Sequence, residues 1–225
     1  TLTATPDATS TFAGWSGACT GTGACVVTMD AAKTVAADFR LRQYTLTTSV
    51  GGTGAGTITS NPVGIACGAT CTATYDHGTM VALTATAAGT SAFSGWTGAC
   101  TGVGACIVTM DQARTVGANF TINQVALTVS KAGTGSGTVT STPAGITCGA
   151  TCTAPFNAGT TITLAAAADA GSTFSGWSGG GCSGTGACTV SLAASTTVTA
   201  TFTLNRYTLT VTRSGAGASY GTVSA

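Results

Sequence analysis

The sequence predicts an all-β protein, a tandem array of small antiparallel β-sandwich-like modules of about 81 residues, each with two local disulfides. Three observations predict this fold class. Trp15, Trp96 and Trp177 recur at a fixed interval of 81 residues, each within a Phe-x-Gly-Trp phrase. Thr and Val alternate in short runs that turns rich in Gly separate. No run keeps a 3.6-residue period for three turns, so no helix is expected.

The repeat divides the chain into two complete modules and two partial ones. The complete modules span 44–124 and 125–206, residues 1–43 are the C-terminal part of a module, and residues 207–225 are the N-terminal part of a further one. At each junction the apolar alternation slips by one residue, which moves the apolar side chains to the other face of a sheet. The chain therefore enters a new core within about four residues, and we expect a stiff rod of modules.

Seven strands are expected in the first complete module, because alternating Thr and apolar residues suit a half-buried pleated surface. Turns containing Gly, Asn, Asp and Pro separate these strands. In chain order the expected strands are Tyr44–Ser49, Gly56–Ser60, Thr72–Tyr75, Thr79–Thr86, Ala92–Trp96, Ala105–Met110 and Thr115–Phe120. Seven short strands in about eighty residues favour a compact antiparallel sandwich or small barrel.

The charge content is very low and excludes two classes of partner. Only 6% of the residues are charged and the formal net charge is +1, so the chain has no basic field for nucleic acid or anionic lipid. The longest apolar stretches, such as Leu164–Ala168, are far shorter than the roughly 20 residues of a membrane helix, and no membrane span is expected. Weak self-repulsion permits close association between copies, as in fibres or layers.

The ten cysteines fall into five close pairs, and every cysteine has a near neighbour. Three pairs have five residues between their members and two pairs have three; the pairs are Cys19 and Cys25, Cys100 and Cys106, Cys182 and Cys188, Cys67 and Cys71, and Cys148 and Cys152. An even, regularly spaced set in a chain with small cores indicates disulfides and an oxidising, extracellular location. We expect each pair to close a local ring that contributes about 2 kcal/mol.

Two alternatives to local disulfides remain at this point. Crossed pairing within a module would join Cys67 to Cys106 and Cys71 to Cys100, since spacing does not fix connectivity. A four-cysteine zinc site is the other alternative, although zinc ribbons favour two-residue spacers. Haem attachment is excluded because Cys-x-x-Cys-His does not occur.

The aromatic phrase connects the sequence to a known family. Phe-x-Gly-Trp, a later Val-Thr-Met-Asp hairpin and a closing Thr-Val-x-Ala-x-Phe strand together resemble the divergent internalin-type B-repeat family of tandem β modules in bacterial surface and secreted proteins. The resemblance covers essentially the whole chain. It implies a stalk, adhesin or spacer outside the cell, and it carries over no catalytic residues. The cysteine pairs depart from the simpler members of the family.

The aromatic residues of the phrase are the bulkiest side chains available to each small core. They are Phe12, Trp15, Phe93, Trp96, Phe174 and Trp177. We expect them to anchor the cores, with the intervening Gly allowing a bend or bulge. The alternative is that an indole is exposed as a platform for sugar rings.

Residues for catalysis or cofactor binding are scarce. His77 is the only histidine and is expected in a solvated turn. Asp30 and Asp111 begin equivalent hairpin turns, and Ala193 takes this place in the third copy. Clustered oxygen ligands for calcium are absent, so no metal, no cofactor and no enzymatic activity are expected.

These observations favour a structural extracellular protein that forms a rigid surface stalk, fibre or filament. Its expected partners are neighbouring modules or copies of itself, because residues 207–225 carry opening strands that the half module at 1–43 lacks, and head-to-tail contact would nearly complete a module. One alternative is an array that binds a glycan or a surface protein. The other is a passive spacer attached to a secreted enzyme.

Overall fold

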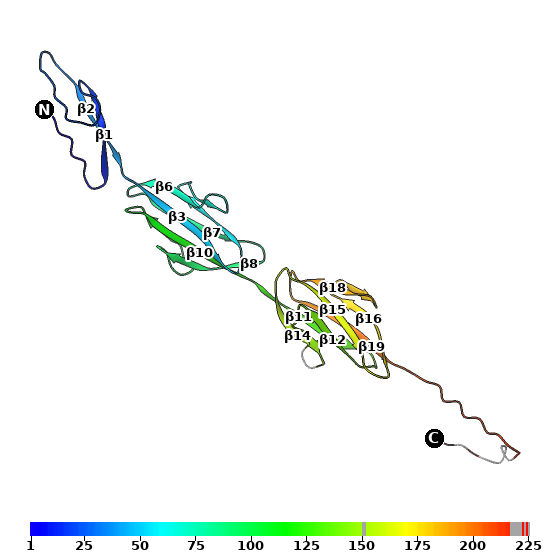
Figure 1. Cartoon of the computed structure of the whole chain (residues 1–225). Helices are drawn as coiled ribbons and strands as arrows, with labels where there is room; N and C mark the ends of the chain where they lie inside the picture. Colours follow the sequence, from blue (N-terminus) through cyan, green and yellow to red (C-terminus); the bar gives the residue numbers. More distant parts are fainter. Residues whose placement is uncertain (150–151, 217–221, 223, 225) are drawn as a thin grey trace. The chain divides into compact units, whose positions relative to one another are not determined.

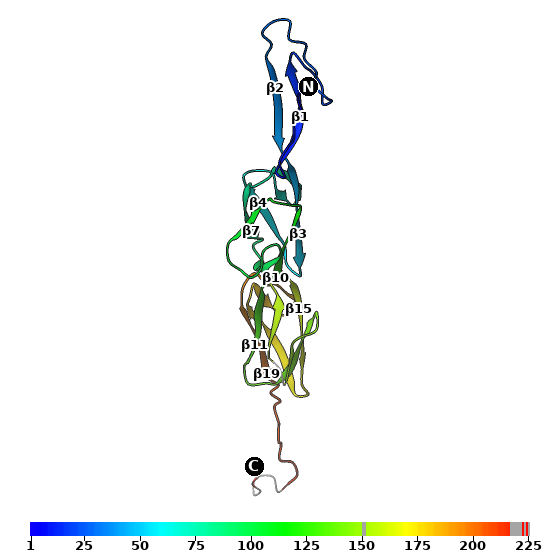
Figure 2. The same ribbon diagram turned by 90° about the vertical axis from the view of Figure 1, so that its left-hand side faces the viewer.

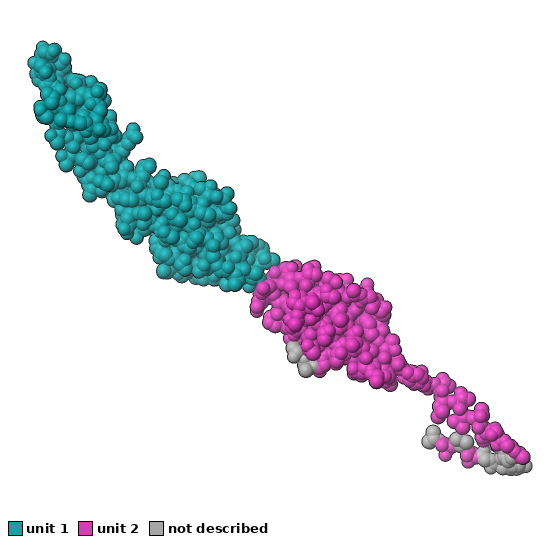
Figure 3. Space-filling view, viewed as in Figure 1, with its two compact units in different colours: residues 1–123 teal, residues 124–225 magenta. Residues whose placement is uncertain are grey.

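The regular structure of the chain consists of β-strands. The computed structural model describes residues 1–149, 152–216, 222 and 224, and no helix occurs among them (Figure 1). The chain forms two compact units, residues 1–123 and 124–225 (Figure 3). The first unit contains a hairpin of β1 (Ser10–Gly17) and β2 (Val35–Leu41), followed by a β-sandwich. The second unit contains another sandwich, and the all-β repeat fold is thereby confirmed.

The first sandwich consists of two four-stranded sheets. Its strands are β3 (Gln43–Gly52), β4 (Gly56–Asn61), β5 (Ala66–Cys67), β6 (Thr72–Asp76), β7 (Met80–Ala87), β8 (Ser91–Gly98), β9 (Cys106–Thr109) and β10 (Arg114–Ile122). One sheet has the order β6-β3-β10-β8 and the other β5-β4-β7-β9. All seven expected strands are present, within a few residues at their ends. The short strand β5 was not predicted, because two residues carry no periodic signal.

The second sandwich repeats this arrangement with one addition. Its strands are β11 (Gln124–Ala132), β12 (Gly137–Thr142), β13 (Thr147–Cys148), β14 (Thr153–Asn157), β15 (Thr161–Ala168), β16 (Ser172–Gly179), β17 (Cys182–Gly184), β18 (Cys188–Ser191) and β19 (Thr196–Leu204). The sheets have the orders β14-β11-β19-β16-β17 and β13-β12-β15-β18. Strand β17 extends one sheet beside β16, in a loop that is one residue longer than its counterpart in the first sandwich.

The opening and closing strands of each sandwich are parallel neighbours, whereas the other strand pairs of the two sandwiches are antiparallel, as the sequence predicts. In the first sandwich β3 pairs with β10 from Leu46 and Arg114 to Gly52 and Phe120 (Figure 2). In the second, β11 pairs with β19 in the same way. The two strands run parallel because the chain crosses to the other sheet and returns between them. The sequence does not reveal this pairing, because Thr and Val alternate in the same way in parallel and antiparallel strands.

Each sandwich has its own apolar core between the two sheets. Every second residue of the central strands points inward, so that the core of the first sandwich includes the fully buried Leu46, Ile58, Val116 and Phe120. The second core is built in the same way and includes the buried Leu127, Val139, Val198 and Phe202. Burial of Val, Leu, Ile and Phe therefore comes from strict alternation in short strands.

The connections between successive β units are very short. Arg42 alone separates β2 from β3, and Asn123 alone separates β10 from β11. Beyond β19, residues 205–214 form no strand. Tyr207 in this segment is 85% exposed. Of the partial module at 207–225, residues 217–221, 223 and 225 lie outside the described residues.

A β-bulge shapes the aromatic strand of the first sandwich. Phe93 faces Phe120 and Gly95 faces Asn119, so Ser94 is the additional residue. Gly95 has a φ of +144°, and a Cβ at this position would lie 3.1 Å from the carbonyl oxygen of Gly102. The expected bend within the phrase is present, and only glycine adopts it without strain.

Replacing Gly95 by Ala is expected to lower the free energy of unfolding of the first sandwich by about 1–3 kcal/mol, the cost of a strained backbone. The measurement is native-state hydrogen exchange of the β8 and β10 amides in the full chain. Gly89→Ala is the matched control, because Gly89 has no positive φ and open space around it. Equal protection in both variants would contradict the assignment of strain to the bulge.

Candidate functional site

The disulfides join the two sheets of each sandwich at the points where the chain crosses between them. Cys67 lies in β5 and Cys71 just before β6, so their bond joins one sheet to the other. Cys100 follows β8 and Cys106 begins β9, so the second bond also joins the two sheets. The second sandwich repeats both links with Cys148–Cys152 and Cys182–Cys188, and Cys19–Cys25 closes the corresponding ring of the first, partial repeat.

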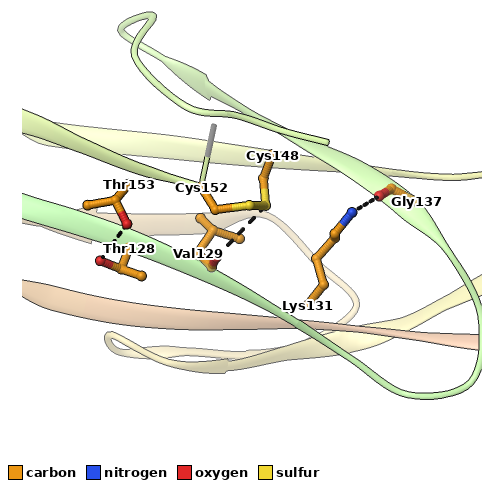
Figure 4. The surroundings of a disulfide bond; sticks show 7 residues. All are labelled: Thr128, Val129, Lys131, Gly137, Cys148, Cys152 and Thr153. Atoms are coloured by element: carbon orange, nitrogen blue, oxygen red, sulfur yellow. Dashed lines mark hydrogen bonds between the residues drawn. A yellow bond between two sulfur atoms is a disulfide. The ribbon is translucent and has the colours of Figure 1, made fainter. Parts of the chain in front are cut away.

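The shorter rings are also tied to the opening strand. Figure 4 shows this for Cys148–Cys152, where the Sγ atom of Cys148 lies 3.8 Å from the carbonyl oxygen of Val129 in β11. The backbone N–H of Val129 donates to the carbonyl of Cys152 at 2.7 Å. In the first sandwich the N–H and hydroxyl of Thr48 both donate to the carbonyl of Cys71, at 2.7 and 3.0 Å. Each short ring therefore braces the strand that begins its sandwich.

The rings of the aromatic phrase pack against one another and against the cores of the two sandwiches. The rings of Phe93 and Trp96 meet edge to face at 5.0 Å, and Phe93 also contacts Phe120 at 5.7 Å. The indoles of Trp96 and Trp177 are each 5% exposed. The same edge-to-face pairing joins Phe174 to Trp177 in the second sandwich and Phe12 to Trp15 in the partial repeat. Phe12 and Trp15 are only half-buried.

Each indole N–H has a backbone acceptor that the sequence analysis missed. The Nε1 atoms donate to the carbonyls of Gly23, Gly104 and Gly186 at 2.8, 3.0 and 3.1 Å. A buried indole N–H needs such a partner. The available signal was the spacing, since glycine follows tryptophan by eight residues in two copies and by nine in the third.

Two ion pairs lie in equivalent turns on the surface. Arg114 donates to Asp111 at 2.7 Å, and Lys33 lies 2.9 Å from Asp30 in the equivalent turn. Hydrogen bonding from Arg114 lowers the pKa of Asp111, and hydrogen bonding from Lys33 lowers that of Asp30. His77 lies in a turn, as expected, and is partly exposed. Its ring packs 5.9 Å from that of Tyr44, and its Nδ1 atom is buried without a hydrogen-bond partner.

The Arg114 bond predicts a pH effect. In Arg114→Gln the pKa of Asp111 is expected to rise, because the charged hydrogen bond that favours the carboxylate is removed. A lowered folded-state pKa gives stability that is present above the unfolded pKa and is lost as the pH falls through the folded value, below about pH 4. NMR titration of the carboxyl group measures this shift. Asp7 is the internal control: its pKa is lowered chiefly by the hydrogen bond from the hydroxyl of Ser10, so it should be the same in Arg114→Gln as in the wild type.

Among the described residues, no group of three or more His, Cys, Asp or Glu side chains forms a cluster that suits a metal ion. All ten sulfurs are in disulfides in this structure, each within one of the sequence pairs rather than in the crossed arrangement. The described part of the chain also contains no helix with the length and apolar character needed to cross a membrane.

Comparison with known families identifies the repeat. The model of the divergent InlB B-repeat domain matches residues 1–43, 44–124 and 127–206. The chain belongs to the divergent InlB B-repeat family. The resemblance seen in the aromatic phrase and the closing strand is thereby confirmed. Residues 1–43 match the same family model as the two sandwiches, which explains why this partial repeat has the aromatic phrase and the closing strand in common with them.

Several solved structures are similar to this B-repeat chain at low identity. The Bacillus anthracis TIE protein is 6% identical with a TM-score of 0.41, and the match covers 77% of this chain and 38% of that chain. A C-terminal fragment of the pilus adhesin SpaC from Lactobacillus rhamnosus GG is 12% identical with a TM-score of 0.38, and the match covers 75% of this chain and 100% of the fragment. The major pilin T-13 of Streptococcus pyogenes is 10% identical with a TM-score of 0.31, and the match covers 72% of this chain and 97% of the pilin. None of the curated proteins matches the B-repeat sequence.

Proposed function

We propose that this chain is a tension-bearing segment of a bacterial surface or secreted stalk, without catalytic activity, in which the modules at 44–124 and 125–206 are the mechanical units. Two observations support the location and the structural role. The divergent B-repeat family consists of surface repeats. The five disulfides are stable in an oxidising, extracellular compartment.

The parallel pairing of the opening and closing strands carries the mechanical part of the proposal. A pull on the two ends of the first sandwich acts on Gln43 at the start of β3 and on Ile122 at the end of β10. Because the strands are parallel neighbours over seven residue pairs, this pull slides them past each other and loads their hydrogen bonds together. The strands β11 and β19 give the second sandwich the same geometry over six pairs.

The disulfides add a second element to this design. Each ring encloses a short segment, with a sequence separation of 4 or 6, so the rings leave most of the module free to extend once the parallel strands separate. Their contribution is to hold the two sheets together at the crossovers. Resistance to force is then governed by the rate of unfolding, which the parallel pair sets.

Force spectroscopy on the full chain tests the proposal. Pulling at the two chain ends should produce two unfolding events, one for each sandwich. The matched control attaches handles at Thr90 and Asn123, which flank the end at which Ser91 faces Ile122. This pull separates β8 and β10 one pair at a time and should open the first sandwich at a lower force. Equal forces in the two geometries would reject a tension-bearing role.

Binding of glycans by the indoles has less support as a function. Two of the three rings are 5% exposed, and each indole N–H donates to a backbone carbonyl. Glycan-array binding that is lost in Trp96→Ala and Trp177→Ala while the fold is retained would instead favour the binding array. A catalytic domain elsewhere in the parent sequence would favour the spacer role.

A further inference from the structure

Strand β7 of the first sandwich has an open edge inside a complete module. β9 pairs with β7 only as far as Leu83, which faces Cys106. β7 continues to Ala87, and over this length it pairs with β4 on its other side. Among the described residues no strand pairs with the β9 side of β7 beyond Leu83. The end of β7 therefore lacks a neighbour on one edge.

The backbone of Ala85 points to this open edge. In an antiparallel ladder every second residue directs its N–H and C=O to the same neighbouring strand. The carbonyl of Thr79 accepts from the N–H of Met110, next to β9, so Ala85 directs its groups to the same side. The N–H of Ala88 donates to the carbonyl of Ala55, on the β4 side, which agrees with this alternation. In the part of the chain that the structure describes, Ala85 thus meets no partner strand on the β9 side.

The aromatic phrase keeps this edge open. A longer β7–β9 ladder would place Gly104 opposite Ala85. The carbonyl of Gly104 instead accepts from Nε1 of Trp96 at 3.0 Å, so the loop before β9 turns toward β8. In the second sandwich the carbonyl of Gly186 is held in the same way by Trp177 at 3.1 Å, and β18 likewise pairs with only the first half of β15. The open edge is therefore a repeated feature of the module.

A groove of about 400 Å³ adjoins the open edge in the first sandwich. Its lining includes Ala85, Phe93 and Trp96, together with Val103 and Ile107. Every residue that lines it is uncharged. A charge buried there would lose its hydration without gaining a counter-ion, so the groove selects for an uncharged partner segment.

The apolar side chains at this groove are not required by the fold. Met80, Val103 and Ile107 are 64%, 71% and 55% exposed, and Met80 and Ile107 project from adjacent strands on one face. The second sandwich has the same strands, but its residues at these three positions are Thr161, Thr185 and Thr189. Exposed apolar side chains that a sister module replaces by threonine indicate an interaction surface of the first sandwich.

We infer that the edge of β7 at Ala85 and the adjoining groove bind an uncharged, extended peptide segment of a partner protein by strand addition. The segment lies antiparallel to β7 and in line with β9, in the place that Gly104 leaves. Its main chain pairs with the N–H and C=O of Ala85, and its apolar side chains contact Val103 and Ile107, which distinguishes the first sandwich from the second. This binding does not depend on whether the sandwiches bear tension.

NMR titration of the full chain with a short capped peptide of alternating threonine and valine tests this inference. The amide signals of residues 84–87 and 103–107 should shift to saturation. The same peptide with methyl groups on the backbone nitrogens that face β7 should lose this binding, because it keeps the side chains but lacks the donors.

Three results would overturn the inference. They are a lack of saturable shifts at these amides, equal binding of the methylated peptide, and shifts that follow the concentration of the chain alone, which would place a second copy on the edge.

Substitutions between the two sandwiches test the groove. Val103→Thr combined with Ile107→Thr should weaken binding by about tenfold, because apolar contact area is lost. The fold should be retained, since Thr185 and Thr189 occupy these positions in the second sandwich. Val63→Thr is the matched control, because Val63 is 93% exposed away from the groove lining and should leave binding unchanged.

Unchanged affinity in the double variant would overturn the role of the groove. The unfolding force in end-to-end pulling should be the same in the double variant as in the wild type. Failure of peptide binding would therefore leave the tension-bearing proposal intact.

Discussion

Replacing Phe120 by Ala is expected to lower the free energy of unfolding of the first sandwich by about 3–5 kcal/mol. The ring is fully buried between the sheets and contacts the ring of Phe93 at 5.7 Å. It also fills the space over Gly56, where a Cβ would lie 2.4 Å from the ring. Glycine at position 56 leaves no side chain that could move into the cavity, so relaxation is limited and the expected cost is toward the upper part of the range.

Hydrogen exchange of the β3 and β10 amides in the full chain measures this change, with the β11 and β19 amides as an internal reference. Phe39→Ala is the matched control, because Phe39 has the same place in the repeat but is 46% exposed. The control should leave both sandwiches unaffected. A loss of protection in the first sandwich of less than about 1 kcal/mol would show that the core repacks around the missing ring.

The sequence predicts the strands well because the physical signal is local. Strict alternation of Thr with Val or Leu, repeated at 81 residues, identified all seven main strands of a module. The cysteine spacing identified the disulfide pairs for a similar reason, since Cys67 and Cys71 lie only 4.2 Å apart at Cα when the chain turns from β5 to β6. A residue pair this close in sequence meets in any fold that places a turn there.

The features that the sequence did not predict depend on contacts between distant residues. Parallel pairing of β3 with β10 joins residues such as Leu46 and Arg114, and no local pattern records which strand lies beside which. The indole acceptors are backbone carbonyls, which every residue possesses. Tyr44 packs against the first core, whereas Tyr207 at the equivalent position of the repeat is 85% exposed, so the burial of this tyrosine depends on its neighbours rather than on the local sequence.

Removing both disulfides of the first sandwich is expected to lower its free energy of unfolding by about 4 kcal/mol. Loop-closure entropy gives about 2 kcal/mol for each short ring. A domain of this size has a total stability of about 5–15 kcal/mol, so the loss is a large part of the whole. The loss should exceed that caused by a surface substitution, because both disulfides connect the two sheets at the points where the chain crosses between them.

The test replaces Cys67, Cys71, Cys100 and Cys106 by Ala in the full chain and compares exchange of the β10 amides with that of β19. The second sandwich retains its own rings and should be unchanged. Chemical reduction of the wild type separates the loss of the crosslink from the loss of side-chain volume, because the thiols keep the sulfur atoms in place. Reduction should destabilise both sandwiches by similar amounts, since both have rings with sequence separations of 4 and 6. If β10 stays as protected as β19 in the four-cysteine variant, the sheets are held by the core and the parallel strands alone.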